Sequence, residues 1–521
     1  MALPHSTRCR AARSRRLASR SVLLILAFAL LGGVLATSAA AKVPGRPVVD
    51  PTLAPTPTPS AAPIVISPGA GLYAQFGYSP PFTRNSPSFD ASGRPYIRSR
   101  SADPDYTGFV HTWRDGAWRR LDMTAALKAA YPDYAGTQGG GGGPTARIIF
   151  DAHDRAYTLV SIRLRGDGIR NVLLWSTDHC ATWHAVDLPQ GDVVPESWTG
   201  HNDLDGPPPL LVGRVGSAIS PDTGKLVREL WFTRPYLAGE TVVVPEPIMV
   251  SARSLSLGDG ATTASPLATH GDTTWIVYAE TTTLPGRGSP VSIATYRHDS
   301  GTLGKPVLLA WARLGNDGHA QPGIALDSQG YLHVIAGAHG RSFQYRRTLV
   351  PYTAYEGWSQ LEPVATTGYK ESARAAEEGR QTYLAFVCDA RDRLHVVYRQ
   401  WRKNTDTAFN GDLYGALSYQ RRDALLGWTA PRPVIVPPYS DYSIYAQTLS
   451  MDRGGRLFIS ASCVAGAEGS DRKTAVAAWR QAGSDGPQPP LYLRRMVLVS
   501  TDGGDSWRFA DTADLTAGIT P

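Results

Sequence analysis

The sequence predicts an all-β fold, a β-propeller of seven four-stranded blades. A short phrase recurs along it: an apolar strand, an Asp, two or three small or polar residues, and a second apolar strand. Successive copies lie 50 to 71 residues apart, a length of chain that suits a four-stranded blade. Helical periodicity is confined to a short stretch at 124–130. The aspartates of the seven copies are Asp90, Asp151, Asp222, Asp272, Asp327, Asp389 and Asp452.

Each copy has the chemistry of a tight turn between two strands. The Asp carboxylate accepts hydrogen bonds from nearby backbone N–H groups, and Gly tolerates a positive φ. Alternating Val, Ile, Leu and Tyr on either side of the turn are strand-forming residues. A β-sandwich of unrelated hairpins is the alternative fold, and the even repetition of the phrase favours the propeller.

Residues 1–41 have the composition of a secretory signal peptide. Six arginines and no acidic residue precede an apolar run at 22–35, and small residues at 38–41 offer a cleavage site. The apolar run is short for a membrane span. We therefore expect a secreted or periplasmic protein, and the arginine pair at 15–16 leaves twin-arginine export open beside the general route.

Residues 42–69 are predicted to be a Pro-rich linker, which leaves 70–521 for the propeller domain. Pro recurs at every second position through 55–59, a composition that favours an extended chain that buries nothing. The formal net charge of +7 falls to about +1 once the six signal arginines are removed. No basic patch argues for nucleic acid as a partner, and no later segment is apolar enough to span a membrane.

Three cysteines follow the signal peptide: Cys180, Cys388 and Cys463. They allow at most one internal disulfide, for which Cys388 with Cys463 is one pairing, and buried free thiols are the alternative. Their spacing is not that of a metal site, so no metal or other cofactor is predicted, although a structural calcium or zinc ion is not readable from sequence. The polar segment 201–205 is interpreted as a solvated loop, with contact to a ligand or cation as the alternative.

Two further segments, 176–183 and 500–507, resemble the Asp-box of sialidase-type propellers. Both follow apolar strands, and both run from a Ser through an Asp to a Trp. The second copy is complete, whereas the first has Cys180 where the motif has glycine. In that motif the Asp ties a hairpin turn, so these aspartates are predicted to be structural.

Four polar side chains in the fifth and sixth repeats are the candidate catalytic residues. His319 precedes the first strand of the fifth repeat and His339 ends its second strand, while Tyr383 and Arg399 hold the equivalent positions in the sixth repeat. Because the innermost strands of a propeller converge on its axis, we expect all four in one funnel. Two imidazoles, a phenol and a guanidinium suit proton removal beside a carboxylate.

The segment around these residues resembles BNR-4 repeat proteins, a group that includes seven-bladed ulvan lyases and related rhamnosyl–glucuronate lyases. The resemblance covers roughly 310–460 and rests on 316–327, 331–334, 337–339 and 342–347. Family members carry two histidines about twenty residues apart, then a tyrosine and an arginine. The matching residues here are His319, His339, Tyr383 and Arg399, and the predicted substrate-binding residues are Tyr445, Asn316 and Tyr345.

This resemblance implies a polysaccharide lyase that cleaves uronate-containing glycans by β-elimination. Arg399, with one histidine, would neutralise the uronate carboxylate. Tyr383 or His339 would take the C5 proton. Whichever of these two is not the base, or else His319, would protonate the leaving O4, and the product would be a 4,5-unsaturated uronate. Which residue is base and which is acid stays open. The chain departs from the family at His319-Ala320, where His-Asn is usual.

Two other function classes stay open. A sialidase-like glycoside hydrolase fits the Asp-box resemblance, but no pair of carboxylates stands out as acid and nucleophile. A non-catalytic carbohydrate-binding propeller fits the missing Asn. All three classes share a polysaccharide or oligosaccharide as partner.

Overall fold

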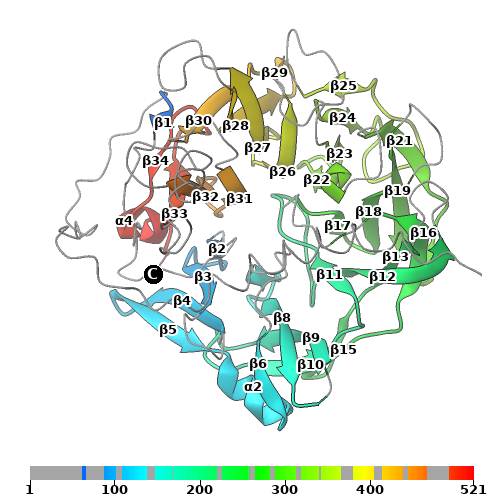
Figure 1. Cartoon of the computed structure of the whole chain (residues 1–521), viewed down its shortest axis with the longest axis vertical. Helices are drawn as coiled ribbons and strands as arrows, with labels where there is room; N and C mark the ends of the chain where they lie inside the picture. Colours follow the sequence, from blue (N-terminus) through cyan, green and yellow to red (C-terminus); the bar gives the residue numbers. More distant parts are fainter. Residues whose placement is uncertain are drawn as a thin grey trace, which may run out of the picture. The chain divides into compact units, whose positions relative to one another are not determined.

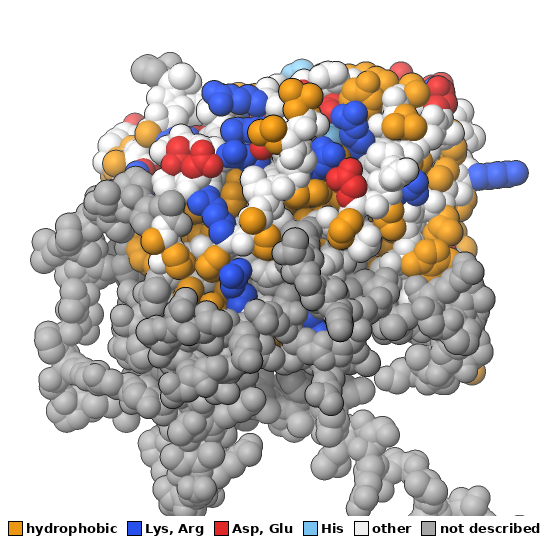
Figure 2. Space-filling view, turned by 90° about the horizontal axis from the view of Figure 1, so that it is seen from above, with side chains coloured by type: hydrophobic (Ala, Val, Ile, Leu, Met, Phe, Trp, Pro, Cys, Tyr) orange, Lys and Arg blue, Asp and Glu red, His pale blue; other side chains and the backbone are white. Residues whose placement is uncertain are grey.

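The computed structural model describes residues 62–65, 87–100, 108–137, 147–166, 168–219, 226–255, 257, 264–281, 288–312, 318–338, 342–364, 380–403, 413–437, 444–465 and 492–520. The predicted signal peptide and most of the predicted linker lie outside these residues. No helix of the described part is long and apolar enough to cross a membrane. Figure 2 shows acidic and basic side chains interspersed over the described part of one side of the molecule.

The described strands form seven antiparallel blades arranged as a β-propeller, which confirms the predicted fold class (Figure 1). Each blade is a sheet whose strands follow one another in the chain, so that every blade is one repeat. The short helices α2 (Thr124–Ala130) and α4 (Thr512–Thr516) lie outside the sheets.

The first three blades occupy the N-terminal half of the domain. Blade 1 is β2 (Ser88–Phe89), β3 (Pro95–Arg100), β4 (Gly108–Arg114) and β5 (Ala117–Asp122). Blade 2 is β7 (Ile149–Phe150), β8 (Ala156–Leu164), β9 (Gly168–Ser176) and β10 (His184–Asp187), with β6 (Tyr134–Thr137) also on β8. Blade 3 is β11 (Asp192–Pro195), β12 (Leu210–Ile219), β13 (Leu226–Thr233) and β16 (Ile248–Ser254), and a separate hairpin pairs β14 (Tyr236–Ala238) with β15 (Thr241–Val243).

The last four blades carry the BNR-4-like segment. Blade 4 is β17 (Leu267–His270), β18 (Thr273–Ala279), β19 (Pro290–Arg297), β20 (Thr302–Leu303) and β21 (Val307–Trp311). Blade 5 is β22 (Gly323–Leu326), β23 (Leu332–Ala336), β24 (Gln344–Arg347) and β25 (Glu362–Pro363). Blade 6 is β26 (Gln381–Cys388), β27 (Leu394–Lys403), β28 (Leu413–Asp423), β29 (Gly427–Trp428) and β30 (Arg432–Val436). Blade 7 is β31 (Ile444–Met451), β32 (Leu457–Ala465), β33 (Tyr492–Ser500) and β34 (Arg508–Phe509).

The recurring Asp closes the turn between the first two strands of a blade, as its sequence setting predicts. In blade 6, Asp389 Oδ1 accepts from the backbone N–H groups of Arg391 and Arg393, both at 2.9 Å. Its Oδ2 lies 3.0 Å from His395 Nε2. The same backbone pattern recurs at Asp151 and Asp327. One buried carboxylate thus fixes both the turn and the strand that follows it.

Blade 3 departs from this rule. Asp222 lies outside the described residues, in the connection between β12 and β13, so the phrase there marks the second connection of the blade and not the first. The first connection is instead the long segment that follows β11. A turn signal in the sequence locates a hairpin without saying which hairpin of the blade it is.

The two Asp-box-like segments form matching turns. Ser176 Oγ donates to Asp178 Oδ1 at 2.8 Å and accepts from the backbone N–H of Cys180 at 2.9 Å. In the second copy, Ser500 Oγ donates to Asp502 at 2.7 Å and accepts from the N–H of Gly504 at 2.8 Å. Gly504 and Cys180 both have a positive φ, 91° and 71°, so Cys180 adopts a backbone conformation that favours glycine. Both turns are structural.

The hydrophobic core lies between neighbouring sheets. One cluster joins blades 6 and 7 through Val397, Leu417, Leu449 and Ile459, among others. Another joins blades 4 and 5 and includes Ala320, whose side chain is 0% exposed. Each blade therefore buries its apolar faces against its two neighbours, which is the packing that holds a propeller together.

Part of the predicted linker belongs to the folded domain. The strand β1 (Ile64–Val65) pairs in parallel with β30 at the edge of blade 6. Ile64 also packs against the core between blades 6 and 7. The extended segment predicted over 42–69 therefore reaches the propeller before residue 69.

The connection between β11 and β12 carries a loop that we call the axial loop, residues 196–205. It starts in blade 3, yet the backbone oxygen of Thr199 accepts from the N–H of Cys388 in blade 6 at 2.7 Å. The N–H of Asp203 donates to Thr269 of blade 4 at 3.0 Å. Blades 3 and 6 are separated by two blades, so the axial loop links sheets that do not pack against each other.

Glu196 anchors the start of the axial loop. Its buried carboxylate accepts from the N–H and the hydroxyl of Thr269, at 2.7 and 2.5 Å, and from Asn202 Nδ2 at 2.7 Å. Burial raises the pKa of Glu196 to about 7, because desolvation disfavours the charged carboxylate more than these hydrogen bonds favour it.

The thiols of Cys180 and Cys388 are free and buried. Of the two alternatives that the sequence left open, Cys388 therefore takes the free-thiol state, and the pairing of Cys388 with Cys463 is not formed.

Candidate functional site

The candidate site lies where the innermost strands of blades 5 and 6 run side by side. These strands are β22 and β26, and they contact each other at the inner edge of the ring (Figure 1). His319 stands in the 3-10 turn η2 (Gly318–Ala320) immediately before β22. Tyr383 is the third residue of β26, and Arg399 lies on β27 of the same blade.

Three of the four predicted catalytic residues are in contact. The rings of His319 and Tyr383 meet edge to face, with 5.3 Å between centroids and 79° between planes. Arg399 lies on the same phenol ring, its Cζ atom 4.7 Å from the ring centroid. The sequence prediction that residues from two consecutive blades converge therefore holds for His319, Tyr383 and Arg399 as a matter of placement.

Tyr383 has a strained backbone. Its φ is 60°, a left-handed value that is unusual for a bulky residue. The register between β26 and β27 shifts between Thr382 and Ala385, so Tyr383 sits in a β-bulge. Gln447 of blade 7 donates from Nε2 to the carbonyl oxygen of Tyr383 at 2.6 Å. Bulges of this kind re-aim a side chain, here toward His319.

Arg399 is fully buried beneath the phenol ring. Its side chain is 0% exposed, and its Cζ atom also lies 5.8 Å from the ring centroid of Trp401. The neighbouring strand leaves room for it at Gly415, where a Cβ atom would come within 3.3 Å of Arg399 Cδ. A guanidinium is more weakly hydrated than an ammonium and stacks on aromatic faces, which suits it to this dry position.

The departure from the family at Ala320 is accommodated by packing. Ala320 belongs to the core between blades 4 and 5 and has no exposed surface. A small apolar side chain fits this position, so His319 is held by the turn η2 and by the burial of the residue after it.

The remaining predicted residues are placed as follows. His339 and Asn316 lie outside the described residues, as does the side chain of Tyr445, whose backbone is in β31. Tyr345 lies inside blade 5, 0% exposed, with its hydroxyl 2.8 Å from His333 Nδ1. This contact makes Tyr345 part of the blade interior, and the contacts among His319, Tyr383 and Arg399 are formed without it.

Tyr345 belongs to a motif that blade 6 repeats. In blade 5, His333 Nε2 lies 3.1 Å from Asp327 Oδ2, and its Nδ1 faces Tyr345. In blade 6, His395 lies between Asp389 and Tyr419, at 3.0 and 2.7 Å. Burial lowers the pKa of both histidines, so each is a neutral imidazole that donates to the Asp and accepts from the Tyr.

Sequence reasoning missed two residues that shape the site: Gln447, which holds the bulged peptide of Tyr383, and Trp401, which flanks Arg399. Trp401 follows Arg399 by two residues on one strand, so the two-residue period could have placed both on one face. Gln447 had no such signal, because its contact with Tyr383 depends on the packing of blade 7 on blade 6.

This site can combine a fixed cation with two groups that transfer protons. An imidazole and a phenol both act as general acids and bases, and a guanidinium stabilises a carboxylate or an oxyanion. His319 is the one common metal ligand among these three contacting side chains, too few to hold an ion there.

Residues 287–471 match the BNR repeat-containing family. No curated protein matches the sequence.

Three solved structures illustrate the similarity. An ulvan lyase bound to -[GlcA(1-4)Rha3S]- is 10% identical, with a TM-score of 0.40, over 89% of this chain and 100% of that chain. A second ulvan lyase structure is 13% identical, with a TM-score of 0.33, and the match spans 49% of this chain and 55% of that one. A variant of NanB sialidase from Streptococcus pneumoniae is 9% identical, with a TM-score of 0.37, over 72% of this chain and 86% of that chain. The resemblance of the sequence to BNR-4 repeat proteins is thus confirmed over residues 287–471, the part of the chain that contains His319, Tyr383 and Arg399.

Proposed function

We propose that this protein is a secreted polysaccharide lyase that cleaves uronate-containing glycans by β-elimination. The observation that carries the proposal is the contact of an imidazole, a phenol and a buried guanidinium at the entry of two neighbouring blades. The same three residues match the catalytic order of the lyases in the BNR-4 group. A glycan substrate is also in keeping with the carbohydrate-active enzymes among the similar structures.

In the proposed reaction, Arg399 supplies the positive charge. Because Arg399 is fully buried, it acts on a uronate carboxylate through its electric field and not by direct contact, and this field makes the adjacent C5 proton easier to remove. The guanidinium also stabilises negative charge on the phenol oxygen of Tyr383 while a proton is transferred. Because Arg399 is buried and lies against the rings of Tyr383 and Trp401, its charge needs no reorganisation as the reaction proceeds.

Tyr383 and His319 would divide the proton transfers, with His339 as a further base or acid. One group removes the C5 proton and another protonates the O4 that leaves, and the product carries a 4,5-double bond. The edge-to-face contact of the Tyr383 and His319 rings supports this division, because two groups that act on one sugar linkage must lie close together.

The test is an assay for the unsaturated product. The purified protein is incubated with a panel of uronate glycans, including ulvan and rhamnosyl–glucuronate-tipped arabinogalactans, and ultraviolet absorbance of the 4,5-unsaturated uronate is followed. We expect a rise that Tyr383→Phe reduces by about 100-fold or more, because a hydroxyl that transfers a proton has been removed. His339→Ala tests the histidine that lies outside the described residues.

The outcomes separate the function classes. New reducing ends without ultraviolet absorbance would replace the lyase by a hydrolase. Tight glycan binding with no product from any member of the panel would show a binding propeller. Product formation that Tyr383→Phe leaves unchanged would remove Tyr383 from the mechanism.

A further inference from the structure

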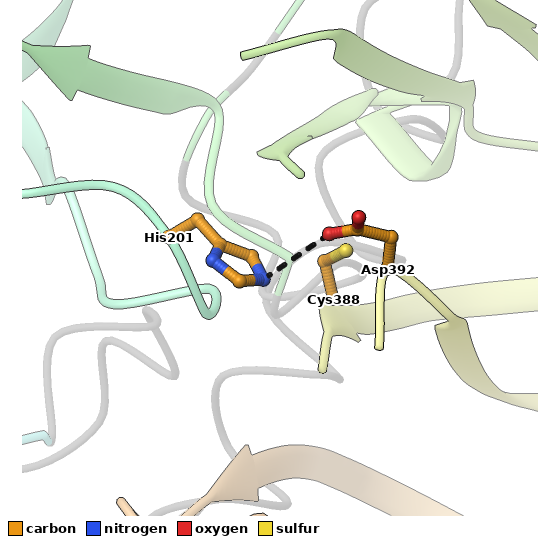
Figure 3. Close-up of side chains that lie close together, drawn as sticks. All are labelled: His201, Cys388 and Asp392. Atoms are coloured by element: carbon orange, nitrogen blue, oxygen red, sulfur yellow. Dashed lines mark ion pairs between the residues drawn. The ribbon is translucent and has the colours of Figure 1, made fainter. Parts of the chain in front are cut away.

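Three side chains, two from one turn and one from a distant loop, meet at the opposite end of β26 from Tyr383. They are His201 of the axial loop, Cys388 at the end of β26, and Asp392 in the turn that follows (Figure 3). One ligand atom from each lies within 4.8 Å of the others. His201 Nε2 and Asp392 Oδ1 are 3.7 Å apart, and His201 and Asp392 are each about one-fifth exposed.

The backbone holds these groups in place from both sides. His201 Nε2 lies 2.8 Å from the carbonyl oxygen of Asp389, and this oxygen is 3.9 Å from Cys388 Sγ. Asp392 accepts from the backbone N–H and the hydroxyl of Ser328 in blade 5, at 2.7 and 2.8 Å. A fourth possible donor atom, the carbonyl oxygen of Asp389, therefore faces the same small space.

The backbone of the axial loop approaches the backbone of blade 6 so closely at Gly200 that a side chain would not fit. A Cβ atom on Gly200 would lie 1.8 Å from the carbonyl oxygen of Cys388, so only glycine lets the axial loop reach blade 6 here. The residue type at Cys388 is also unusual for its position, which is directly before the turn Asp of the blade. At the equivalent position four of the other blades carry larger apolar residues, namely Phe89, Phe150, Leu326 and Met451. The smaller Cys388 makes room for His201 and supplies a thiol.

We propose that His201, Cys388 and Asp392 bind a divalent transition-metal ion of the zinc class, which fastens the axial loop to blade 6. A nitrogen, a sulfur and a carboxylate oxygen are the donor types of tetrahedral zinc sites. Donor atoms around such an ion lie about 3.5 Å apart, so the three side chains must draw together by roughly 1 Å. The Asp389 carbonyl oxygen or a water completes the set.

Binding has a defined proton balance. Burial raises the pKa of Cys388 well above its usual range, so the free thiol is protonated, and the ion displaces that one proton to solvent. His201 must offer an unprotonated Nε2, which requires the tautomer that carries its proton on Nδ1 and breaks the hydrogen bond to Asp389. No electron is transferred. The site does not depend on the proposed lyase reaction.

The test uses the purified protein after treatment with a chelator, titrated with Co²⁺ and, separately, with Zn²⁺. Cobalt bound to a thiolate shows a sulfur-to-metal charge-transfer band in the near ultraviolet, and Zn²⁺ should raise the melting temperature. We expect both signals in the unaltered protein and in Cys180→Ser, which removes the second buried free thiol of the described residues. Cys388→Ser should lose the cobalt band.

A second variant covers the case in which Cys388→Ser does not fold. His201 is on a loop and is partly exposed, so His201→Gln should fold and should bind Zn²⁺ about 100-fold more weakly or not at all. A protein that shows neither a cobalt band nor a Zn²⁺-dependent rise in melting temperature would overturn the proposal. A cobalt band that survives Cys388→Ser, or an unchanged affinity in His201→Gln, would place the ion elsewhere and overturn it as well.

Discussion

The Cζ atom of Arg399 lies 4.7 Å from the ring centroid of Tyr383, and Tyr383 stands in a β-bulge of the neighbouring strand β26. Charge and phenol are therefore positioned by the same blade, one from β26 and one from β27. This arrangement makes the site sensitive to the shape of the cation and not only to its charge.

Arg399→Lys should lower the rate of unsaturated uronate formation by about 100-fold. Lysine keeps the charge but lacks the planar group that lies on the Tyr383 ring and near Trp401 in this buried position. Initial rates over a range of glycan concentrations measure the effect. Arg402→Lys, three residues along the same strand, is the matched control and should keep full activity, whereas equal rates for both variants would contradict the role of Arg399.

Gln447→Met should reduce kcat while leaving KM little changed. The variant keeps the length of the side chain but loses the N–H that bonds to the carbonyl of Tyr383, and the strained φ of 60° is then less firmly held. A misplaced proton-transferring group slows the chemical step more than it weakens substrate binding. A loss confined to KM would instead indicate that Gln447 contacts the substrate.

Glu196→Gln should remove part of the dependence of stability on pH. The carboxyl titrates near 4.5 in the unfolded chain and near 7 in the folded protein, so the unfolded chain loses its proton first. Stability falls as pH rises from about 4.5 to 7 and then levels off, a loss of up to about 3 kcal/mol. The amide of the variant mimics the protonated acid, so its melting temperature should decline less across this window. Parallel melting curves for both proteins would show that Glu196 is ionised throughout.

Asp389→Asn should destabilise the protein by about 1 to 3 kcal/mol, measured by urea unfolding. The carboxylate accepts from two backbone N–H groups, from Arg393 Nε and from His395, and it is 5% exposed. An amide can satisfy only some of these donors, which leaves a buried group without its bond. Asp299→Asn, in an exposed turn, serves as the control and should change the free energy of unfolding by less than about 0.5 kcal/mol.

The fold could be predicted from the sequence because the residues that define each blade lie close together in the chain. The turn at Asp389 is closed by residues two, four and six positions later, so its pattern can be read from a short window. The same locality brought His319 and Tyr383 together, since each stands at the entry of the first strand of its blade, whereas Arg399 lies in the middle of β27 and not at the end of a strand. The pairing of Ile64–Val65 with β30 was not predicted, because nothing in these two residues indicates which strand they pair with.

The contacts that escaped prediction join distant parts of the chain. Gln447 and Tyr383 are 64 residues apart, and His201 lies 188 residues from Asp389, whose carbonyl it meets. Such pairs depend on how blades pack and on where a loop ends, and single-sequence patterns do not encode either. The position of Asp222 within its blade was mispredicted for a related reason. A turn motif does not indicate which hairpin of a blade it closes.

The axial loop also has a consequence for how the protein folds. In a ring of repeats, each unit touches only its neighbours, so folding can start anywhere and spread, and separate stretches can open independently. A loop that leaves blade 3 and ends on blade 6 adds contacts of large sequence separation, which can form only after blade 6 exists. Such contacts slow the last stage of folding and make distant blades unfold together. The molecule should therefore unfold in one cooperative transition. The blades in the middle of the chain should not unfold before the blades at its C-terminal end.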